Sequence, residues 1–434
     1  MKLPFQTILI GVSIAAFIGA ILIFAGVIKV GSSSQSSSSA ATVSVWGVYP
    51  STVVQPYIDS LNIENKSTRI YYEEVSGDAL AGRLTAALAE GQQPDLVITD
   101  SENFFSIKNR VYTIPFTTYP ERSFRDTYVD GSALFLSQDG VMALPLLVDP
   151  VVAYYNKDML AGKNYVVPPT TWTSLVSLMP QFVKNNAKGA ITQTLLPFGE
   201  YSNVDHFKDI LATLFLQVGN PITTFDTVTQ SYTSTLATTG ASEENPVISA
   251  LAFFVNFSNP TSDTYSWNKT LSSGLDMFLS GKSAFYIGRA SELFTLQKRN
   301  PNLNFDVTQV FQPVGIVRPT TFGSFSSLSI VKATTQFDAA YTVAGQLSGK
   351  EFVEYLAGET ALPPARRDIL VTPQKNPYEQ VFFKSALNAF GWPDINPAAT
   401  ENVFRDMIQG VTSGRYTPAE AIYETSRNLQ SVIR

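Results

Sequence analysis

Residues 144–172, LPLLVDPVVAYYNKDMLAGKNYVVPPTTW, carry the strongest structural signal in this chain of 434 residues. The run from Leu144 to Tyr155 is rich in Leu, Val and Tyr, which predicts a strand covered on both faces. Pro145 and Pro150 are expected to divide it into two short pieces, because proline cannot donate to a sheet ladder. The joint between the two pieces is a candidate hinge.

Asp149 lies inside this apolar run. An unpaired carboxylate is costly to bury, so Asp149 requires either a local hydrogen-bond partner or a polar ligand. Both interpretations stay open at this point. The side chain could accept backbone hydrogen bonds at the Pro150 turn, or it could contact a bound molecule.

The length and composition restrict the possible domain organisation and binding partners. The chain is too long for one hydrophobic core, so two lobes are expected. It has 30 basic and 36 acidic residues, a formal charge of −6 and no basic cluster, which argues against a nucleic-acid partner. It has no cysteine, and His206 is the single histidine, so we expect neither a metal site nor a cofactor.

The N-terminus predicts a membrane anchor. Ile8 to Ile28 contains no charged residue and, at about 1.5 Å per residue, is long enough to cross a hydrocarbon core of roughly 30 Å. A cleaved signal peptide is the alternative, although its apolar region is usually about 7–15 residues. Residues 1–30 are therefore predicted as a transmembrane anchor and the Ser-rich residues 31–41 as a flexible linker. The remaining domain, 42–434, is expected on the extracytoplasmic side.

Residues 42–100 alternate between strand and helix patterns. TVSVWGVY, RIYYEEV and DLVITD read as strands, with helices after Pro50 and after Gly77, the second with Asp78 as a candidate cap and Gly91 as its end. This order predicts right-handed crossovers and a parallel sheet, whose ligands sit beyond the carboxyl ends of the strands. That rim contains the first candidate ligand contacts, which are Trp46, Tyr49, Asp100 and Ser101.

The later part of the chain is mainly helical. Thr171 is a candidate cap for a helix carrying Leu175, Leu178, Met179 and Phe182, and Phe337–Leu356 is amphipathic. Thr417, Pro418 and Glu420 form a predicted capping box at the start of the last helix. These segments predict a helical second lobe.

Three blocks of this chain resemble the extracellular solute-binding proteins of ABC importers, the maltose-binding-like family. The blocks are Tyr155-Asn-Lys-Asp with the following Pro-Pro-Thr-Thr-Trp, the segment Leu271–Arg289 with its Gly281-Lys282 step, and Leu362-Pro-Pro-Ala-Arg366. The resemblance covers about residues 43–434. It implies an α/β, two-lobed periplasmic-binding-protein-like fold with crossing hinge segments, with lobe 1 at about 42–147 and 283–328 and lobe 2 at about 150–282 and 329–434.

The resemblance also implies a function and further site residues. The chain is expected to be a monomeric, membrane-anchored receptor that binds a small polar solute, a carbohydrate, and presents it to an ABC transporter permease, with no enzymatic activity. Asp149 matches a crossing-strand carboxylate that contacts ligand in relatives. Tyr201 and Phe404 correspond to cleft aromatics. Arg289 stands where the family usually has an aromatic, so it is expected to meet an anionic group or a structural carboxylate.

Two other functions stay open. Asp100 and Asp149 could be the paired carboxyls of a membrane-tethered carbohydrate hydrolase. Alternatively, the same fold could serve as a sensory or adhesion module. Neither alternative has a motif of its own. The Gly281-Lys282-Ser283 step lacks the spacing of a phosphate-binding loop, and His206 is expected at a surface or cleft edge.

Overall fold

The computed structural model describes residues 40–237 and 245–433. The predicted membrane span at residues 1–30 and residues 31–39 of the predicted linker lie outside this part of the chain. Among the described residues, no helix combines the length and apolar character needed to cross a bilayer.

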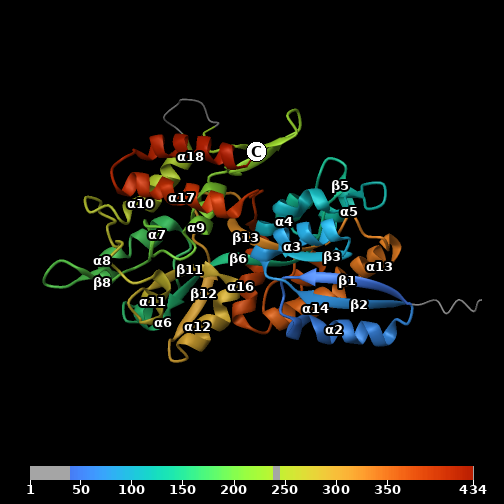
Figure 1. Ribbon diagram of the computed structural model, residues 1–434. Coiled ribbons are helices and arrows are strands. Elements are labelled where there is room, and N and C mark those ends of the chain that lie inside the picture. The colour runs from blue at the N-terminus through green and yellow to red at the C-terminus, as the bar shows by residue number, and fades with distance from the viewer. Residues whose placement is uncertain (1–39, 238–244, 434) are drawn as a thin grey trace, which may run out of the picture.

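The chain folds into two α/β lobes that lie side by side and are joined by strands running between them (Figure 1). Lobe 1 contains β1 (Ala41–Gly47), α2 (Ser51–Glu64), β2 (Thr68–Glu74), α3 (Gly77–Glu90), β3 (Leu96–Asp100), α4 (Ser101–Ile107), η1 (Lys108–Arg110), β4 (Ile114–Pro115), α5 (Glu121–Thr127), η2 (Asp130–Phe135), β5 (Gly140–Val141), α13 (Phe337–Leu347), α14 (Lys350–Thr360) and α15 (Arg367–Leu370).

Lobe 2 contains α6 (Lys157–Ala161), α7 (Trp172–Val176), α8 (Met179–Phe182), β7 (Lys184–Asn185), β8 (Ile191–Gln193), α9 (Phe207–Gln217), β9 (Thr223–Asp226), β10 (Ser231–Ser234), α10 (Pro246–Asn256), α11 (Gly274–Leu279), β11 (Phe285–Arg289), η3 (Ala290–Glu292), α12 (Leu293–Arg299), β12 (Phe305–Gln309), α16 (Pro377–Ala386), α17 (Pro397–Thr412) and α18 (Pro418–Val432). Three strands lie at the junction or cross it, and these are β6 (Leu144–Asn156), β13 (Thr321–Ile330) and β14 (Ala389–Phe390).

The main sheet has the order β11-β6-β13-β3-β1-β2. β1 pairs in parallel with both β2 and β3, which confirms the predicted parallel sheet and its helical crossovers. β13 is antiparallel to β3 and to the first half of β6. The carboxyl ends of β1 and β3 therefore face the junction with lobe 2, where the rim residues were expected.

β6 corrects the predicted division of the Leu144–Tyr155 run. It is one continuous strand of 13 residues and not two short pieces. Pro150 instead marks the place where β6 changes partners: the first half pairs with β13, whereas Val151–Asn156 pairs with β11 on one side and β12 on the other. The missing amide hydrogen of Pro150 is tolerated because the ladder changes at that residue.

The division of the chain between the lobes also differs from the predicted one. Strands β11 and β12 pair with the second half of β6, so residues 285–309 belong to lobe 2, although the prediction placed them in lobe 1. Residues 337–360 form α13 and α14, which pack on β1, β13 and α2 in lobe 1, although the prediction placed them in lobe 2. The chain crosses between the lobes near Pro150, near Thr321 and between α15 and α16.

The predicted helix ends are partly correct. Thr417 forms the expected capping box with Glu420, and Thr171 is the expected N-cap, which the structure completes as a capping box with Ser174. Gly91 ends α3 with a left-handed φ of 69°. The N-cap of α3 is Ser76 and not Asp78, which lies in the first turn. The helix expected after Thr171 divides into α7 and α8, because Pro180 cannot donate the hydrogen bond that would continue α7.

Candidate binding cleft between the lobes

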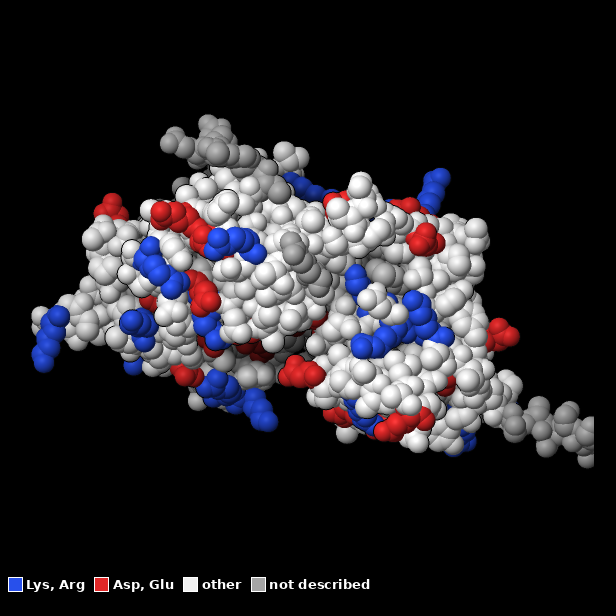
Figure 2. Space-filling view, turned by 45° about the horizontal axis from the view of Figure 1, so that its top comes forward, with Lys and Arg blue, Asp and Glu red and all other residues white. Residues whose placement is uncertain are grey.

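Two adjacent cavities occupy the junction of the lobes. The larger, of about 380 Å³, is lined by Asp78, Glu102 and Asn103 from lobe 1 and by His206, Phe207, Lys208, Asp209, Arg289, Pro397, Ala398 and Glu401 from lobe 2. The smaller, of about 230 Å³, is lined by Val48, Tyr49, Asp100, Glu102, Leu147, Asp149, Arg289, Ser324, Ser326 and Leu362. Glu102 and Arg289 line both cavities, so together the two form one cleft. Figure 2 shows a hollow between the lobes with acidic side chains inside it.

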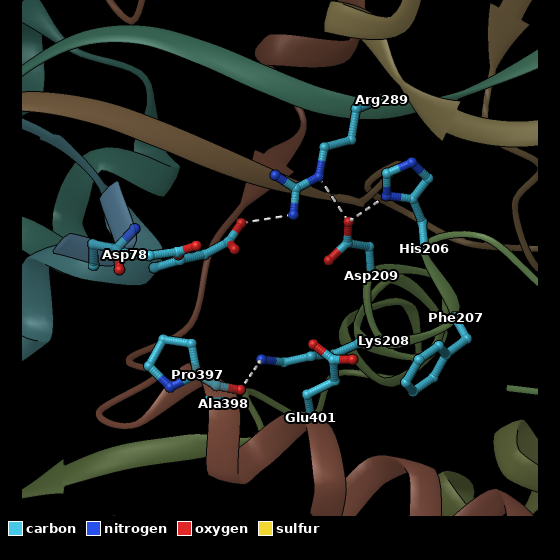
Figure 3. Close-up of a pocket in the computed structure, with 11 residues that line it drawn as sticks. Asp78, His206, Phe207, Lys208, Asp209, Arg289, Pro397, Ala398 and Glu401 are labelled. Carbon is cyan, nitrogen blue, oxygen red and sulfur yellow. Dashed lines mark hydrogen bonds and ion pairs between the residues drawn. The ribbon is translucent and has the colours of Figure 1, made fainter. Parts of the chain in front are cut away.

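Arg289 lies at the centre of the cleft and ties the lobes together (Figure 3). Its Nε donates to Oδ2 of Asp209 at 2.7 Å, and its Nη2 donates to Oε1 of Glu102 at 2.6 Å. Asp209 belongs to α9 of lobe 2, whereas Glu102 belongs to α4 of lobe 1. One guanidinium therefore makes a charged contact with each lobe.

Burial and the neighbouring charges shift the pKa values of Asp209 and Glu102. Burial acts to raise the pKa of Asp209, but Arg289 and His206 together hold it well below its ordinary range. Burial raises the pKa of Glu102 above its ordinary value, and Arg289 opposes that shift without cancelling it. Arg289 therefore lowers the pKa of both carboxyl groups, and its charge is shared between Asp209 and Glu102.

His206 joins this group from the N-cap position of α9, immediately before the helix. Its Nδ1 lies 3.4 Å from Oδ2 of Asp209, and its Nε2 lies 3.0 Å from Oε2 of Glu292. Burial lowers the pKa of His206, but the two carboxylates raise it more strongly, to about 10. The imidazole is therefore a cation at neutral pH. Glu292 also accepts from the hydroxyl of Tyr286 at 3.0 Å and from the backbone nitrogen of Arg289 at 3.0 Å.

Asp149 has the local partner that its burial requires. Its carboxylate accepts from the backbone nitrogen of Ser291 at 3.0 Å and from the Ser291 hydroxyl at 2.6 Å. Burial raises its pKa, and the charge of Arg289 acts in the opposite direction. The partner is thus the short helix η3 and not the Pro150 turn. Asp149 nevertheless lines the smaller cavity, so its two possible roles are compatible.

Tyr49 and Asp100 form the lobe 1 wall of the smaller cavity. The Tyr49 hydroxyl donates to Oγ of Ser326 at 2.6 Å, and that oxygen also accepts from the backbone nitrogen of Leu147 at 3.1 Å. Burial raises the pKa of Tyr49 far above its ordinary value, so its hydroxyl stays protonated. Asp100 caps α4 by accepting from the backbone nitrogen of Asn103 at 2.7 Å. These groups are fixed in position by the fold.

Four of the eight predicted site residues do not line either cavity. Trp46 is 8% exposed and lies beneath the guanidinium of Arg83, 4.4 Å from the ring centre. Ser101 is buried, and its hydroxyl accepts from the backbone nitrogen of Phe325 at 3.0 Å. Phe404 is fully buried against Phe215 and Trp392, and Tyr201 lies beside Phe207 and Arg405. Tyr49, Asp100, Asp149 and Arg289 do line the cleft.

Sequence reasoning missed several lining residues. Glu102 and Asn103 lie in the rim segment but carry no signal of their own. Asp209 is in the apolar α9, and nothing in the sequence connects it with Arg289, which lies 80 positions later. Lys208 faces the cleft but is bound to Asp394 at 2.5 Å and to Thr400 at 2.9 Å. These pairings depend on long-range contacts.

We expect Glu102→Gln to loosen the contact between the lobes. The amide keeps the shape of the side chain but removes the charge that attracts Arg289, which costs about 1–2 kcal/mol of contact energy. Solution scattering should show a larger radius of gyration. Glu73→Gln is the matched control, because Glu73 pairs with Arg83 inside lobe 1. An unchanged radius for Glu102→Gln would mean that this bond does not hold the lobes together.

The comparisons agree with the two-lobed architecture. A sequence profile of bacterial extracellular solute-binding proteins matches residues 57–382. The cyclic α-maltosyl-1,6-maltose binding protein of Arthrobacter globiformis is 16% identical, with a TM-score of 0.73 over 91% of this chain and 99% of that chain. The extracellular solute-binding protein of Staphylococcus aureus, solved with maltose, is 14% identical, with a TM-score of 0.71 over 90% of this chain and 97% of that chain.

A third solved structure is similar to the same extent. The sugar-binding protein of the phytopathogen Xanthomonas citri is 17% identical, with a TM-score of 0.72 over 91% of this chain and 97% of that chain. No curated protein sequence matches the chain. At these identities the solved structures establish the shared fold, and the sequence profile establishes the family.

Proposed function

This chain belongs to the family of bacterial extracellular solute-binding proteins, and we propose that it captures a small carbohydrate between its lobes and delivers it to the permease of an ABC transporter. The observation that supports the proposal is the cleft, whose walls come from both lobes. A ligand can favour lobe closure only if it binds the closed form more tightly than the open form. Contacts from both lobes provide that difference.

The lining of the cleft favours a neutral ligand rich in hydroxyl groups. The three cations that face it from lobe 2, Arg289, Lys208 and His206, already pair with carboxylates. An anionic ligand would have to compete with those carboxylates and face Asp78 and Glu401 as well. A neutral sugar instead matches the hydroxyl and carboxylate groups around it. The sugars named with the similar structures are consistent with this class of ligand.

The cleft offers few surfaces on which a sugar ring could stack. Within the described part of the chain, Tyr49 and Phe207 are the tyrosine and phenylalanine side chains that line the two cavities, and no tryptophan there lines either cavity. Arg289 stands where the sequence comparison with the family expected an aromatic. We therefore propose recognition mainly through hydrogen bonds, by a site suited to a small sugar more than to a long maltodextrin.

No observation favours the hydrolase alternative. Asp100 caps α4 and Asp149 is bonded twice to Ser291, so both carboxylates have structural roles as hydrogen-bond acceptors. The family is one of binding proteins, and the proposal includes no chemical step. Attachment of the domain to the membrane through residues 1–30 remains part of the proposal, because it would keep the receptor close to its permease.

We expect neutral sugars to stabilise the purified protein in a thermal-shift screen. A ligand at about 100 times its dissociation constant adds about 2.7 kcal/mol to the free energy of unfolding, which raises the melting temperature by several degrees. Tyr49→Phe should reduce the shift, because it alters the wall of the cleft, whereas Tyr423→Phe on the exposed face of α18 should not. Stabilisation by organic acids or peptides, with none by sugars, would refute the proposed ligand class.

A further inference from the structure

A β-hairpin of lobe 2 reaches lobe 1 outside the cleft. The hairpin consists of β9 and β10, and it is anchored to α18 of the same lobe. The side-chain nitrogen of Gln430 donates to the carbonyl oxygen of Tyr232 at 3.1 Å, and its side-chain oxygen accepts from the backbone nitrogen of Ser234 at 2.9 Å. In Figure 1 the hairpin lies beside α18 and extends toward α4. It therefore belongs to lobe 2 but contacts lobe 1.

The contact with lobe 1 combines aromatic rings and one cation. The rings of Phe105 and Tyr232 meet edge to face, with 5.9 Å between their centres and 82° between their planes. Nζ of Lys108 lies 4.0 Å from the centre of the Tyr232 ring and 5.9 Å from that of Phe225. Phe105 belongs to α4 and Lys108 to η1, both in lobe 1. We call Phe105, Lys108, Phe225 and Tyr232 the clasp residues.

The ammonium of Lys108 depends on the two rings for compensation. In the described part of the chain no carboxylate forms an ion pair with it, and burial lowers its pKa. A partly desolvated cation above an aromatic face is attracted by the negative charge of that face. Phe105 and Tyr232 are 3% and 9% exposed, so their contact also removes apolar area from water. Opening of the lobes would separate these groups, and the contact therefore favours the closed form.

The base of the hairpin is held in a strained conformation. Ile222 directly precedes β9 and has a φ of 67°, which a β-branched residue rarely adopts. Its side chain is fully buried, and its backbone nitrogen donates to Oδ1 of Asn220 at 2.8 Å. Nδ2 of Asn220 donates to the carbonyl oxygen of Thr235 at 2.8 Å, so this residue joins both ends of the hairpin. Such strain persists where the surrounding structure enforces it, which indicates that lobe 2 fixes the path of the hairpin.

We propose that the clasp residues hold the ligand-free receptor in its closed form and thereby raise its affinity for the solute without touching it. None of the four lines either cavity of the cleft. The proposal rests on the opening and closing of the lobes that the proposed function requires. Because the solute binds the closed form more tightly, an interaction that favours this form before binding increases the apparent affinity.

Distances between spin labels on the two lobes test the proposal. The chain has no cysteine, so two introduced cysteines are the only sites that take the label. Glu90→Cys at the end of α3 and Tyr423→Cys on the exposed face of α18 place one label on each lobe, outside the clasp. In the full-length, ligand-free protein we expect a single distance. Lys108→Ala should lower the ratio of closed to open molecules about fivefold and add a second, longer distance.

Arg415→Ala is the matched control. The guanidinium carbon of Arg415 lies 4.7 Å from the centre of the Tyr416 ring, but both residues belong to lobe 2, so the distances should not change. Lys108→Arg should also keep the single distance, because a guanidinium stacks on aromatic faces. Tyr232→Leu removes the shared ring and should act like Lys108→Ala.

Unchanged distances in both Lys108→Ala and Tyr232→Leu, or a wild-type protein that is already open, would overturn the proposal. These distances are measured without a solute. A failure of every sugar to bind would therefore count against the proposed function, whereas the label distances alone decide whether the clasp residues hold the lobes together.

Discussion

Replacing Arg289 by Met is expected to lower the free energy of unfolding by about 3–5 kcal/mol. The substitution leaves Asp209 and Glu102 without their shared cation, and Asp149 also loses the positive charge that lowers its pKa. The Asp209 side chain is 9% exposed, so water cannot replace the lost partner. Asp209 then keeps His206 as a cationic partner, but Glu102 and Asp149 lose the guanidinium. The cost is therefore that of buried carboxylates that are no longer fully compensated, which exceeds the value of the ion pair itself. Urea unfolding monitored by circular dichroism would measure it.

Arg299→Met is the matched control for this prediction. Arg299 pairs with Asp276 at 2.7 Å, but both side chains are about half exposed, and exposed pairs contribute about 0–1 kcal/mol. Arg289→Lys should recover part of the stability, since an ammonium keeps the charge but cannot hold both carboxylates in the same geometry. Equal losses for Arg289→Met and Arg299→Met would show that the Arg289 contacts have no special energetic role.

The parts of the fold that the sequence predicted are those specified by local patterns. Three strands alternating with two helices at the start of the domain predict a parallel sheet. The helix cap at Thr171 and the capping box of Thr417 with Glu420 likewise depend on residues close together in the sequence. The lobe boundaries were predicted wrongly because they depend on which strands pair with each other across long sequence separations. β11 could extend the sheet of either lobe, and only its pairing with the second half of β6 decides between them.

Local sequence patterns also identified only part of the candidate site. The rule that ligands lie beyond the carboxyl ends of parallel strands correctly placed Tyr49 and Asp100 at the junction. It failed to show that Trp46 turns toward Arg83, because side-chain direction at a strand end depends on packing. The pairing of Arg289 with a structural carboxylate was one of two alternatives. The structure contains two such carboxylates, from opposite lobes, and the sequence offered no means of identifying either.

Replacing His206 by Gln is expected to destabilise the protein by about 2–4 kcal/mol near pH 6, and by progressively less as the pH rises toward 10. The folded-state pKa is about 10, compared with an ordinary value of 6.5. The folded protein therefore retains a proton that the unfolded chain releases above about pH 6.5. The resulting stabilisation is complete below pH 6.5 and disappears as the pH passes through 10. Parallel urea titrations of wild type and variant between pH 6 and 10 would measure the difference.

Because His206 is the single histidine, one imidazole resonance reports its titration directly in the NMR spectrum. Glu292→Gln removes one of the two carboxylates that hold the proton, so it should move the midpoint of that titration to lower pH while leaving the contact with Asp209 in place. The position of His206 also links this proton to the cleft, since Asp209 bonds both His206 and Arg289. Loss of the proton would leave Asp209 with Arg289 as its sole cationic partner among the described residues and would make the net charge of the cleft lining one unit more negative. A midpoint near 6.5 in the wild type would contradict this account, because it would mean that the two carboxylates do not hold the imidazole in its charged form.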